Sequence, residues 1–407
     1  MATKLRVLLS ICYYQLLLYG LMPTTLQLNK CRLTINKVSG GYLVYSGALD
    51  LLLTLGLPLM LPRGIFSGGY MRNNIVLQWG LMVSVSLRAL VLLNCLGMVW
   101  WQRRKLLQLL ANCLKHWQRQ RRLLRRVAGK RALQRLQSQL ANMLLHQLCI
   151  NYAMLLCSMF MQYQLLQAPR LFQLLLRSSH MLLQSVAKIG FITMLLLLSH
   201  QFEAVQLALQ ALQRRSRGHA RTLEDLRRII AVHMECLQLT RHAFGTYSLA
   251  HGTLILNMFS ATLTIIYHAV QYTNQSISSN NWDILFGDLL VSFNIWNVVM
   301  MMNILDYALN SCNNTGQLLQ QFNELRRLSA ESELQLELFV NYLRNNRLDY
   351  KVFNCVALDK PAMLGFMASV LSNLLILMQF DVKRRQEQGL QASNLFGHLN
   401  AKGSKVP

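Results

Sequence analysis

Side chains that could carry out catalysis are few and scattered in this chain. Its 407 residues include only 16 Asp and Glu, and its 10 His are spread along the sequence. The sequence has no H-E-x-x-H pair, no Gly-rich phosphate loop, no G-x-S-x-G and no His-x4-Asp. These spacings serve metal, phosphate and acyl-transfer chemistry. We therefore predict that the protein is not an enzyme and that it binds no metal or cofactor.

Four charged residues lie inside long apolar runs, namely Asp50, Arg88, Lys188 and Asp288. A lone ionised side chain at the centre of a membrane helix costs about 2.5–3.5 kcal/mol, so each should face protein or water. Counted from the cytosolic ends of their runs, Asp50 lies roughly 12 Å deep and Arg88 roughly 20 Å deep. An arginine side chain spans that difference. We predict an Asp50–Arg88 ion pair, with contact to a ligand or ion as the alternative for either residue.

Amide and aromatic residues also gather toward one end of three apolar runs. Aromatic residues commonly lie at membrane interfaces, which is the simpler interpretation of those near the ends of runs. A pocket lined by aromatic rings and a few amides is also what a small organic ligand requires. The candidate pocket residues are Gln162, Tyr163, Tyr267, His268, Asn294 and Trp296.

The last apolar run ends in the stretch SNLLILMQF, residues 372–380. Asp359, Lys360 and Pro361 form a helix-start pattern, and the 20 residues from Pro361 to Phe380 span about 30 Å as a helix, which is one bilayer. A stripe of small residues follows at spacings of three and four: Gly365, Ala368, Ser369 and Ser372. Such a stripe suits close helix packing or a narrow water-filled path. If several copies surround an axis, Gln379 and Phe380 form an uncharged constriction that closes by dewetting and passes cations when open.

Long apolar runs decide the fold class. Hydrophobic residues make up 53% of the chain and charged residues 14%, against about 25% charged in an average globular protein. A helix of about 20 apolar residues crosses a bilayer. Residues 189–198, IGFITMLLLL, lack the charged face that a soluble helix bundle would need. We predict an all-α membrane protein with seven transmembrane helices, near 42–61, 75–101, 141–166, 178–202, 243–272, 284–308 and 361–380.

An earlier apolar piece, residues 7–22, is shorter and is closed by Pro23. No small-residue cleavage site follows it, which argues against a signal peptide. We favour a helix on the membrane surface within a cytoplasmic N-terminal segment, residues 1–41. An eighth span and a cleaved signal are the alternatives.

Lysine and arginine counts predict the orientation. Loops 102–140, 203–242 and 309–351 hold 24 basic residues, whereas loops 62–74, 167–177 and 273–283 hold 4. Cytosolic loops collect Lys and Arg, so the N-terminus should be cytoplasmic and the C-terminus extracellular. This orientation is the reverse of a G-protein-coupled receptor, and we expect no G protein as partner. Asn274, in a sequon of an outer loop, is a glycosylation candidate. Against this orientation, Lys383, Arg384 and Arg385 follow the last span; an eighth span would remove that conflict.

The basic loops carry their own pattern. From Gln102 to Leu140 apolar residues recur at helical spacing, and the pattern returns in 317–350. We predict that residues 309–360 form a cytosolic helical anchor that joins subunits, between the six-helix bundle 42–308 and the last helix, with 381–407 as a tail. The alternative is a basic face that lies on anionic lipid. The net charge of +25 would suggest nucleic acid in a soluble protein, but these charges lie between membrane spans, so we expect no nucleic-acid partner.

With this last helix and this topology, the chain resembles the insect gustatory receptor family. The mark of that family is a last helix with Thr-Tyr, five apolar residues and Gln-Phe; here Ser372-Asn373, LLILM and Gln379-Phe380 stand at that spacing. The segments LDKPAML and YYQLLLYGLMP and the inverted seven-helix topology extend the resemblance over nearly the whole chain. Asn373 departs from this pattern, because the family has Tyr at that position.

The resemblance implies a tetrameric, ligand-gated, non-selective cation channel in the plasma membrane of a sensory neuron. Gln379 and Phe380 would then shape the gate, and the wall of the pore would include Ser372, Leu375 and Ile376. A small-molecule tastant would bind in the outer half of each helix bundle, and related subunits would form homo- or hetero-tetramers among membrane lipids. A multi-span solute transporter, and an odorant receptor of the same superfamily, are the alternatives. Whether the tastant is a sugar, a bitter compound, carbon dioxide or a pheromone stays open.

Overall fold

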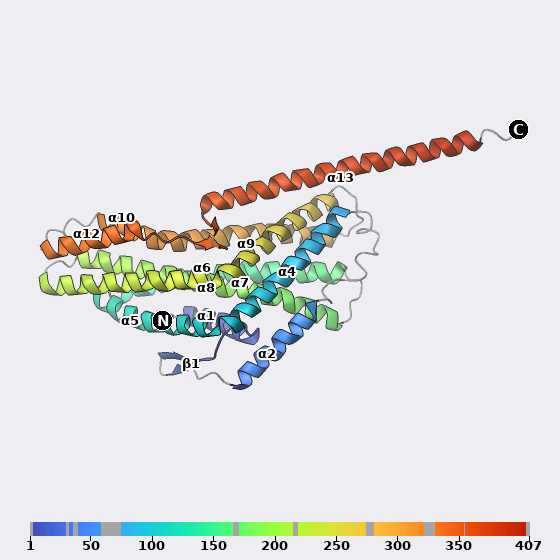
Figure 1. The fold of residues 1–407 in the computed structure, drawn as a ribbon. Helices are drawn as coiled ribbons and strands as arrows, with labels where there is room; N and C mark the ends of the chain where they lie inside the picture. The colour runs from blue at the N-terminus through green and yellow to red at the C-terminus, as the bar shows by residue number, and fades with distance from the viewer. Residues whose placement is uncertain are drawn as a thin grey trace.

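The computed structural model describes residues 3–29, 32–35, 40–57, 75–165, 171–214, 219–273, 281–320, 330–353 and 355–403. Within them the architecture is helical, with two short antiparallel hairpins. The long helices run side by side along one axis, and the last helix lies along one side of the bundle and continues past its end (Figure 1).

The bundle is made of helices that overlap the first six predicted spans, together with α1. Its members are α1 (Thr3–Leu18), α2 (Gly40–Leu55), α4 (Ile75–Trp101), α6 (Lys130–Leu165), α7 (Leu171–Arg214), α8 (His219–Thr273) and α9 (Asn281–Asn313). Five helices of the described chain are long and apolar enough to cross a membrane, within α4, α6, α7, α8 and α9. Gly40–Leu55 and Leu364–Phe380 are shorter apolar segments. The end of the first predicted span, residues 58–61, lies outside the described residues.

Three of these helices are much longer than a bilayer requires. α7 has 44 residues, α8 has 55 and α6 has 36, whereas about 20 suffice to span. Their extra length consists of the segments that the sequence assigned to basic loops. The predicted loop 203–242 is therefore two continuous helical extensions with only residues 215–218 between them undescribed.

These extensions meet α5 (Arg103–Val127), α10 (Thr315–Gln320) and α12 (Ala330–Asn345) at one end of the molecule (Figure 1). The predicted amphipathic pattern of α5 matches its burial, since Leu106, Leu109, Leu123 and Leu124 are all buried. A separate apolar core fills this end, and its members are drawn from α5, α6, α7, α8, α10 and α12. Apolar burial of this kind stabilises a packed helical assembly rather than a set of loops.

The chain reaches its last helix through a tight hairpin. β3 (Lys351–Val352) pairs with β4 (Val356–Ala357), and the Leu358 amide donates to the Tyr350 carbonyl at 3.0 Å. A second hairpin, β1 (Leu26–Asn29) with β2 (Arg32–Ile35), follows α1. α13 (Lys360–Gly403) then runs for 44 residues. The part assigned to the tail is therefore helical as far as Gly403.

Candidate functional site

The start of α13 is fixed by a side-chain cap. Asp359 Oδ1 accepts a hydrogen bond from the Ala362 amide at 2.8 Å, which satisfies one of the first backbone N–H groups of the helix. Pro361 follows in the first turn, where its missing N–H costs no hydrogen bond. The sequence pattern for this helix start is confirmed.

One face of α13 packs on the bundle. Val370 and Leu374 are buried, and Leu374 shares an apolar cluster with Tyr267 of α8. Phe366, one turn before Val370, meets Phe259 of α8 edge to face, with ring centroids 4.9 Å apart. These residues repeat every three or four positions, so a single stripe of the helix faces the rest of the chain.

The opposite face carries the predicted gate residues. Ser372, Leu375, Ile376, Gln379 and Phe380 are all exposed, and Phe380 keeps 63% of its surface. Gly365 and Ala368 lie on the same face and are exposed as well. Asn373 turns back on its own helix, since its Nδ2 donates to the Ser369 carbonyl at 2.7 Å. The face of α13 away from the bundle therefore carries small side chains at Gly365 and Ala368. It carries an amide and an aromatic ring at Gln379 and Phe380, near the end of the apolar segment.

The predicted pocket residues do not come together as one group. Tyr267 is 2% exposed and packs toward α13, whereas Trp296 is 52% exposed and Tyr163 is also exposed. Asn294 is buried and donates to Thr262 Oγ1 at 2.9 Å. The side chains of Gln162 and His268, and the sequon residue Asn274, lie outside the described part of the chain. Tyr163 and Trp296 are on the outer surface of the bundle, as interface aromatics would be.

Buried amides that the sequence reading missed lie deeper, between α6, α7 and α9. Gln147 Nε2 donates to Asn297 Oδ1 at 3.1 Å, and Asn151 Nδ2 donates to Ser185 Oγ. Gln147 Oε1 and Asn151 Oδ1 accept no hydrogen bond within the described residues. Unpaired buried acceptors are costly, so they suit a site where a hydroxyl, an amide or water completes the set. Their signal in the sequence was an amide pair four residues apart in an apolar run.

The predicted Asp50–Arg88 ion pair is wrong for the described residues. Asp50 Oδ2 accepts a hydrogen bond from the indole N–H of Trp100, and no ion pair joins Asp50 to Arg88 in the described chain. Trp100 lies twelve positions beyond Arg88, about 18 Å along α4. α2 therefore meets α4 at its end, and Asp50 lies much nearer that end than the depth count assumed.

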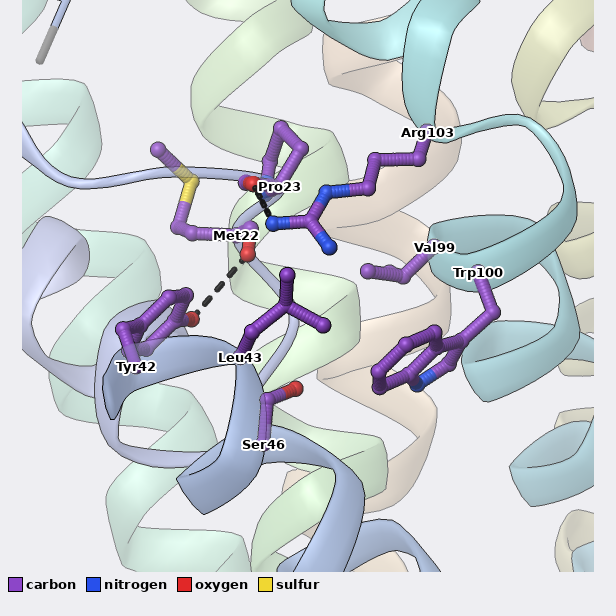
Figure 2. A pocket seen from close by; sticks show the side chains of 8 residues that line it. All are labelled: Met22, Pro23, Tyr42, Leu43, Ser46, Val99, Trp100 and Arg103. Atoms are coloured by element: carbon purple, nitrogen blue, oxygen red, sulfur yellow. Dashed lines mark hydrogen bonds between the residues drawn. The ribbon is translucent and has the colours of Figure 1, made fainter. Parts of the chain in front are cut away.

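A small pocket lies beside Trp100, lined by residues of α2, of the α4–α5 corner and of the segment after α1 (Figure 2). Arg103 Nη2 donates to the Pro23 carbonyl at 2.9 Å, and the Tyr42 hydroxyl donates to the Met22 carbonyl at 3.0 Å. Its volume is about 10 Å³, room for about one water. These hydrogen bonds join the segment after α1 to α2 and to the α4–α5 corner. The pocket is too small for an organic ligand.

Comparisons with known proteins give these features a family. The family model described as 7tm chemosensory receptor matches residues 9–384. A Drosophila melanogaster protein named as a candidate gustatory receptor, 58b, is 40% identical over 408 residues and covers 99% of both chains. The chain belongs to the insect gustatory receptor family. The related candidate gustatory receptor 58a of the same species is 26% identical over 386 residues, covering 91% of this chain and 96% of its own.

Solved structures agree in fold with this gustatory receptor family member. The insect olfactory receptor OR5 from Machilis hrabei, in complex with eugenol, superposes with a TM-score of 0.69, covering 92% of this chain and 98% of its own. A second structure of the same receptor superposes with a TM-score of 0.66 and covers the same shares of the two chains. Identities of 13% and 12% limit these two comparisons to the fold. The family match ends four residues after Phe380, so it includes the whole apolar part of α13.

The hairpin before α13 ties this helix of the receptor to α8. A Cβ built on Gly252 would lie 2.5 Å from Val352 Cγ1 and 2.6 Å from Phe353 Cζ, so the two segments touch where only glycine fits. Phe353 adopts a φ of 53°, which is uncommon for a bulky residue. Tyr350 shares a 2.8 Å hydrogen bond with His251 Nδ1 of α8. Burial raises the pKa of the Tyr350 phenol, so it keeps its proton.

Proposed function

We propose that this protein is a subunit of a taste receptor that works as a ligand-gated, non-selective cation channel in the plasma membrane of sensory neurons. Four subunits, of this chain alone or with related ones, surround an axis lined by α13. A small organic tastant binds within each helix bundle and opens the channel. The segments with 24 basic residues face the cytosol, and the C-terminal end of α13 faces outward.

The exposed face of α13 carries this proposal. Ser372 and Gln379 stand on it together with Leu375, in the middle of the apolar segment Leu364–Phe380 and at its end. Polar side chains that face lipid are unfavourable, so such residues ordinarily face protein or a water-filled path. The described part of the chain packs on the other face of α13. Ser372 and Gln379 would therefore meet water along an axis that several subunits share. The fold shared with an insect olfactory receptor supports a receptor role by analogy.

The ligand site belongs among the buried amides between α6, α7 and α9. Gln147, Asn151 and Asn297 are all buried and two of their oxygens have no hydrogen bond in the described chain. Phe160 of α6 and Phe286 of α9 contact each other between the same pair of helices, with centroids 4.0 Å apart, about 14 Å along α6 from Asn151. Amide and aromatic side chains between the same helices suit an organic molecule with a hydroxyl or carbonyl group. Eugenol, which the olfactory receptor structure holds, is a ligand of that protein.

Cysteine labelling tests the pore assignment. We expect Gln379→Cys and Ser372→Cys to react with a membrane-impermeant cationic thiol reagent, and the reaction at Gln379→Cys to reduce cation currents in cells that express the receptor. Met378→Cys, on the half-buried side of the same turn, is the matched control and should stay unlabelled, as should the unmutated chain. If neither position 379 nor position 380 reacts from outside, at rest or during stimulation, α13 does not line a pore.

A further inference from the structure

A groove lies at the corner where α5 turns into α6, far from the proposed pore. The α5 helix ends with Gly129 at a φ of 86°, and the Gly129 amide donates to the Leu124 carbonyl at 3.2 Å. This left-handed glycine is a common helix ending that reverses the chain. The groove between the corner and α7 has a volume of about 200 Å³. Its floor is apolar, formed by Val127, Ala132, Leu207 and Ala211, and Gln210 and Arg214 stand at its edge.

Exposed basic side chains stand on both helices of this corner, without acidic partners in the described chain. Arg125, Lys130, Arg131 and Arg135 are exposed on the two helices that form the corner, and none of them belongs to an ion pair of the described chain. Arg135 follows Ala132 by three positions and so shares its face of α6. Residues 51–202 contain no Asp or Glu at all. The helices α5 and α6, which carry these basic residues, therefore supply no carboxylate of their own to balance them.

The bilayer is too far away to supply that charge. Phe191 of α7 packs against Tyr350, with ring centroids 5.9 Å apart, and so marks the level at which α13 begins. The groove residue Leu207 lies sixteen positions farther along the same helix, about 24 Å beyond that level. Electrostatic attraction to lipid head groups decays over about 8 Å at physiological salt. If the last span begins near Pro361, as the proposed topology has it, the predicted span 178–202 of α7 extends about 16 Å past the bilayer, and lipid head groups do not reach the groove.

Nucleic acid is also a poor fit. Sequence-independent binding of single strands uses exposed aromatic rings on which bases stack. Between Gln102 and Leu140 the sequence has one aromatic residue, Trp117. It is half-buried and stacks on His200 of α7, with centroids 5.4 Å apart. The basic surface thus lacks a stacking platform, and its distinguishing feature is the apolar floor between the charges.

We propose that this corner is a docking site for an acidic segment of a cytosolic protein. The segment places a bulky apolar side chain on the floor between α5, α6 and α7, and its carboxylates lie against Arg125, Arg131, Arg135 and Arg214. Opposite charge around a small apolar contact gives both attraction and register. The site goes beyond the proposed channel function and needs only that this end of the molecule be outside the bilayer.

A binding measurement on the purified full-length receptor in neutral-lipid nanodiscs tests the site. The probe is a fluorescein-labelled peptide of about twelve residues in which Glu residues flank a central Leu-Phe pair. We expect its fluorescence anisotropy to rise with receptor concentration, with affinity that falls as salt is added. Ala132→Trp, which fills the groove, should weaken binding about tenfold or more. Replacing Leu-Phe by Ser-Ser in the peptide should have a similar effect.

Matched controls separate the groove from charge alone. Ala111→Trp adds the same ring to an exposed position of α5 outside the groove and should leave binding unchanged. Arg131→Glu with Arg135→Glu should abolish binding, whereas the equal charge change Arg104→Glu with Lys105→Glu should not. Equal binding of the Ser-Ser peptide, or of the Leu-Phe peptide to Ala132→Trp, would overturn the proposal, as would no binding at all. Loss of receptor oligomers in Ala132→Trp would also overturn it, by making the groove a contact between copies. Because the readout is binding, these results are independent of whether the receptor conducts.

Discussion

The Asp359 carboxylate stabilises the start of α13 through a single hydrogen bond. Its Oδ1 accepts from the Ala362 amide at 2.8 Å on an exposed turn. Asp359→Ala should cost about 0.5–2 kcal/mol of local stability, as losses of N-cap side chains do. Asp359→Asn keeps an acceptor and should cost little. Hydrogen exchange of the amides of residues 362–365 measures this directly, and equal exchange in the Ala variant and the unmutated chain would contradict the capping role.

Position 116 links receptor stability to pH. His116 is buried beside Glu235, with Nδ1 and Oε2 3.2 Å apart. Burial lowers the pKa of this imidazole below its ordinary value of 6.5, and more strongly than Glu235 raises it. The unfolded chain therefore binds the proton more readily than the folded one. The stabilising contribution is present above pH 6.5 and is lost as the pH falls through the lowered pKa of the folded state.

His116→Asn removes that titration. The melting temperature of the unmutated receptor should fall when the pH is lowered from about 7.5 to about 5.5, and that of the variant should fall less. Arg119→Gln is the control, because it removes the arginine that pairs with Glu235 but leaves the imidazole. This variant should keep most of the fall in melting temperature. An equal decline in the variant and the unmutated chain would mean that other groups cause it.

Local patterns were predictable from the sequence at this scale, and pairings were not. Asp359 and Pro361 identify a helix start because a cap depends on residues within one turn. The Asp50 partner depends on where α2 crosses α4, and that crossing places Asp50 against Trp100 at the end of α4 rather than against Arg88. Likewise the aromatic residues Tyr163 and Trp296 were grouped with Tyr267 by their depth along the chain, but the azimuth of each helix turns them to the outside.

At the scale of elements, the β3–β4 hairpin joins three helices. It follows α12, precedes α13 and packs on α8, where Val352 and Phe353 approach Gly252. His251 and Tyr350 extend the contact into an aromatic cluster with Phe191 and Phe244. We therefore expect a movement of α8 to shift the first turn of α13 through this contact. The helices themselves were predictable from periodicity, but this contact was not, since it joins residues about a hundred positions apart.

Gly252→Ala tests this contact. The added Cβ would overlap Val352 Cγ1 and Phe353 Cζ, so the hairpin must shift or strain, at a typical cost of about 1–3 kcal/mol for overpacking. We expect a lower melting temperature and reduced ligand-evoked current with the protein still at the cell surface. Gly245→Ala on the same helix meets nothing within 4 Å and should be neutral or slightly stabilising. Equal behaviour of the two variants would remove the coupling role of the hairpin.

At the scale of the whole molecule, two of the exposed apolar faces in the described chain indicate contacts that a single chain leaves unmade. One is the face of α13 with Leu375 and Phe380, and the other is on α12, where Leu334 and Leu338 are 54% and 57% exposed. The sequence predicted a cytosolic helical anchor here, and the structure gives α10 and α12 a shared core with α7 and α8. Which face meets a neighbouring subunit could not be derived from periodicity, since α12 is apolar on both its buried and its exposed sides.

Introducing negative charge at the exposed leucines tests whether α12 joins subunits. Leu334→Glu with Leu338→Glu leaves the buried face of Leu336, Phe339 and Leu343 intact, so each chain should still fold. Carboxylates at a subunit contact would have to be buried against an apolar surface, which weakens association. We therefore expect the purified protein to shift from tetramer to monomer in light scattering. Glu333→Gln, an exposed change on the same helix, should keep the tetramer. A tetramer that survives the two Leu→Glu changes would place the subunit contact elsewhere, for example on the exposed face of α13.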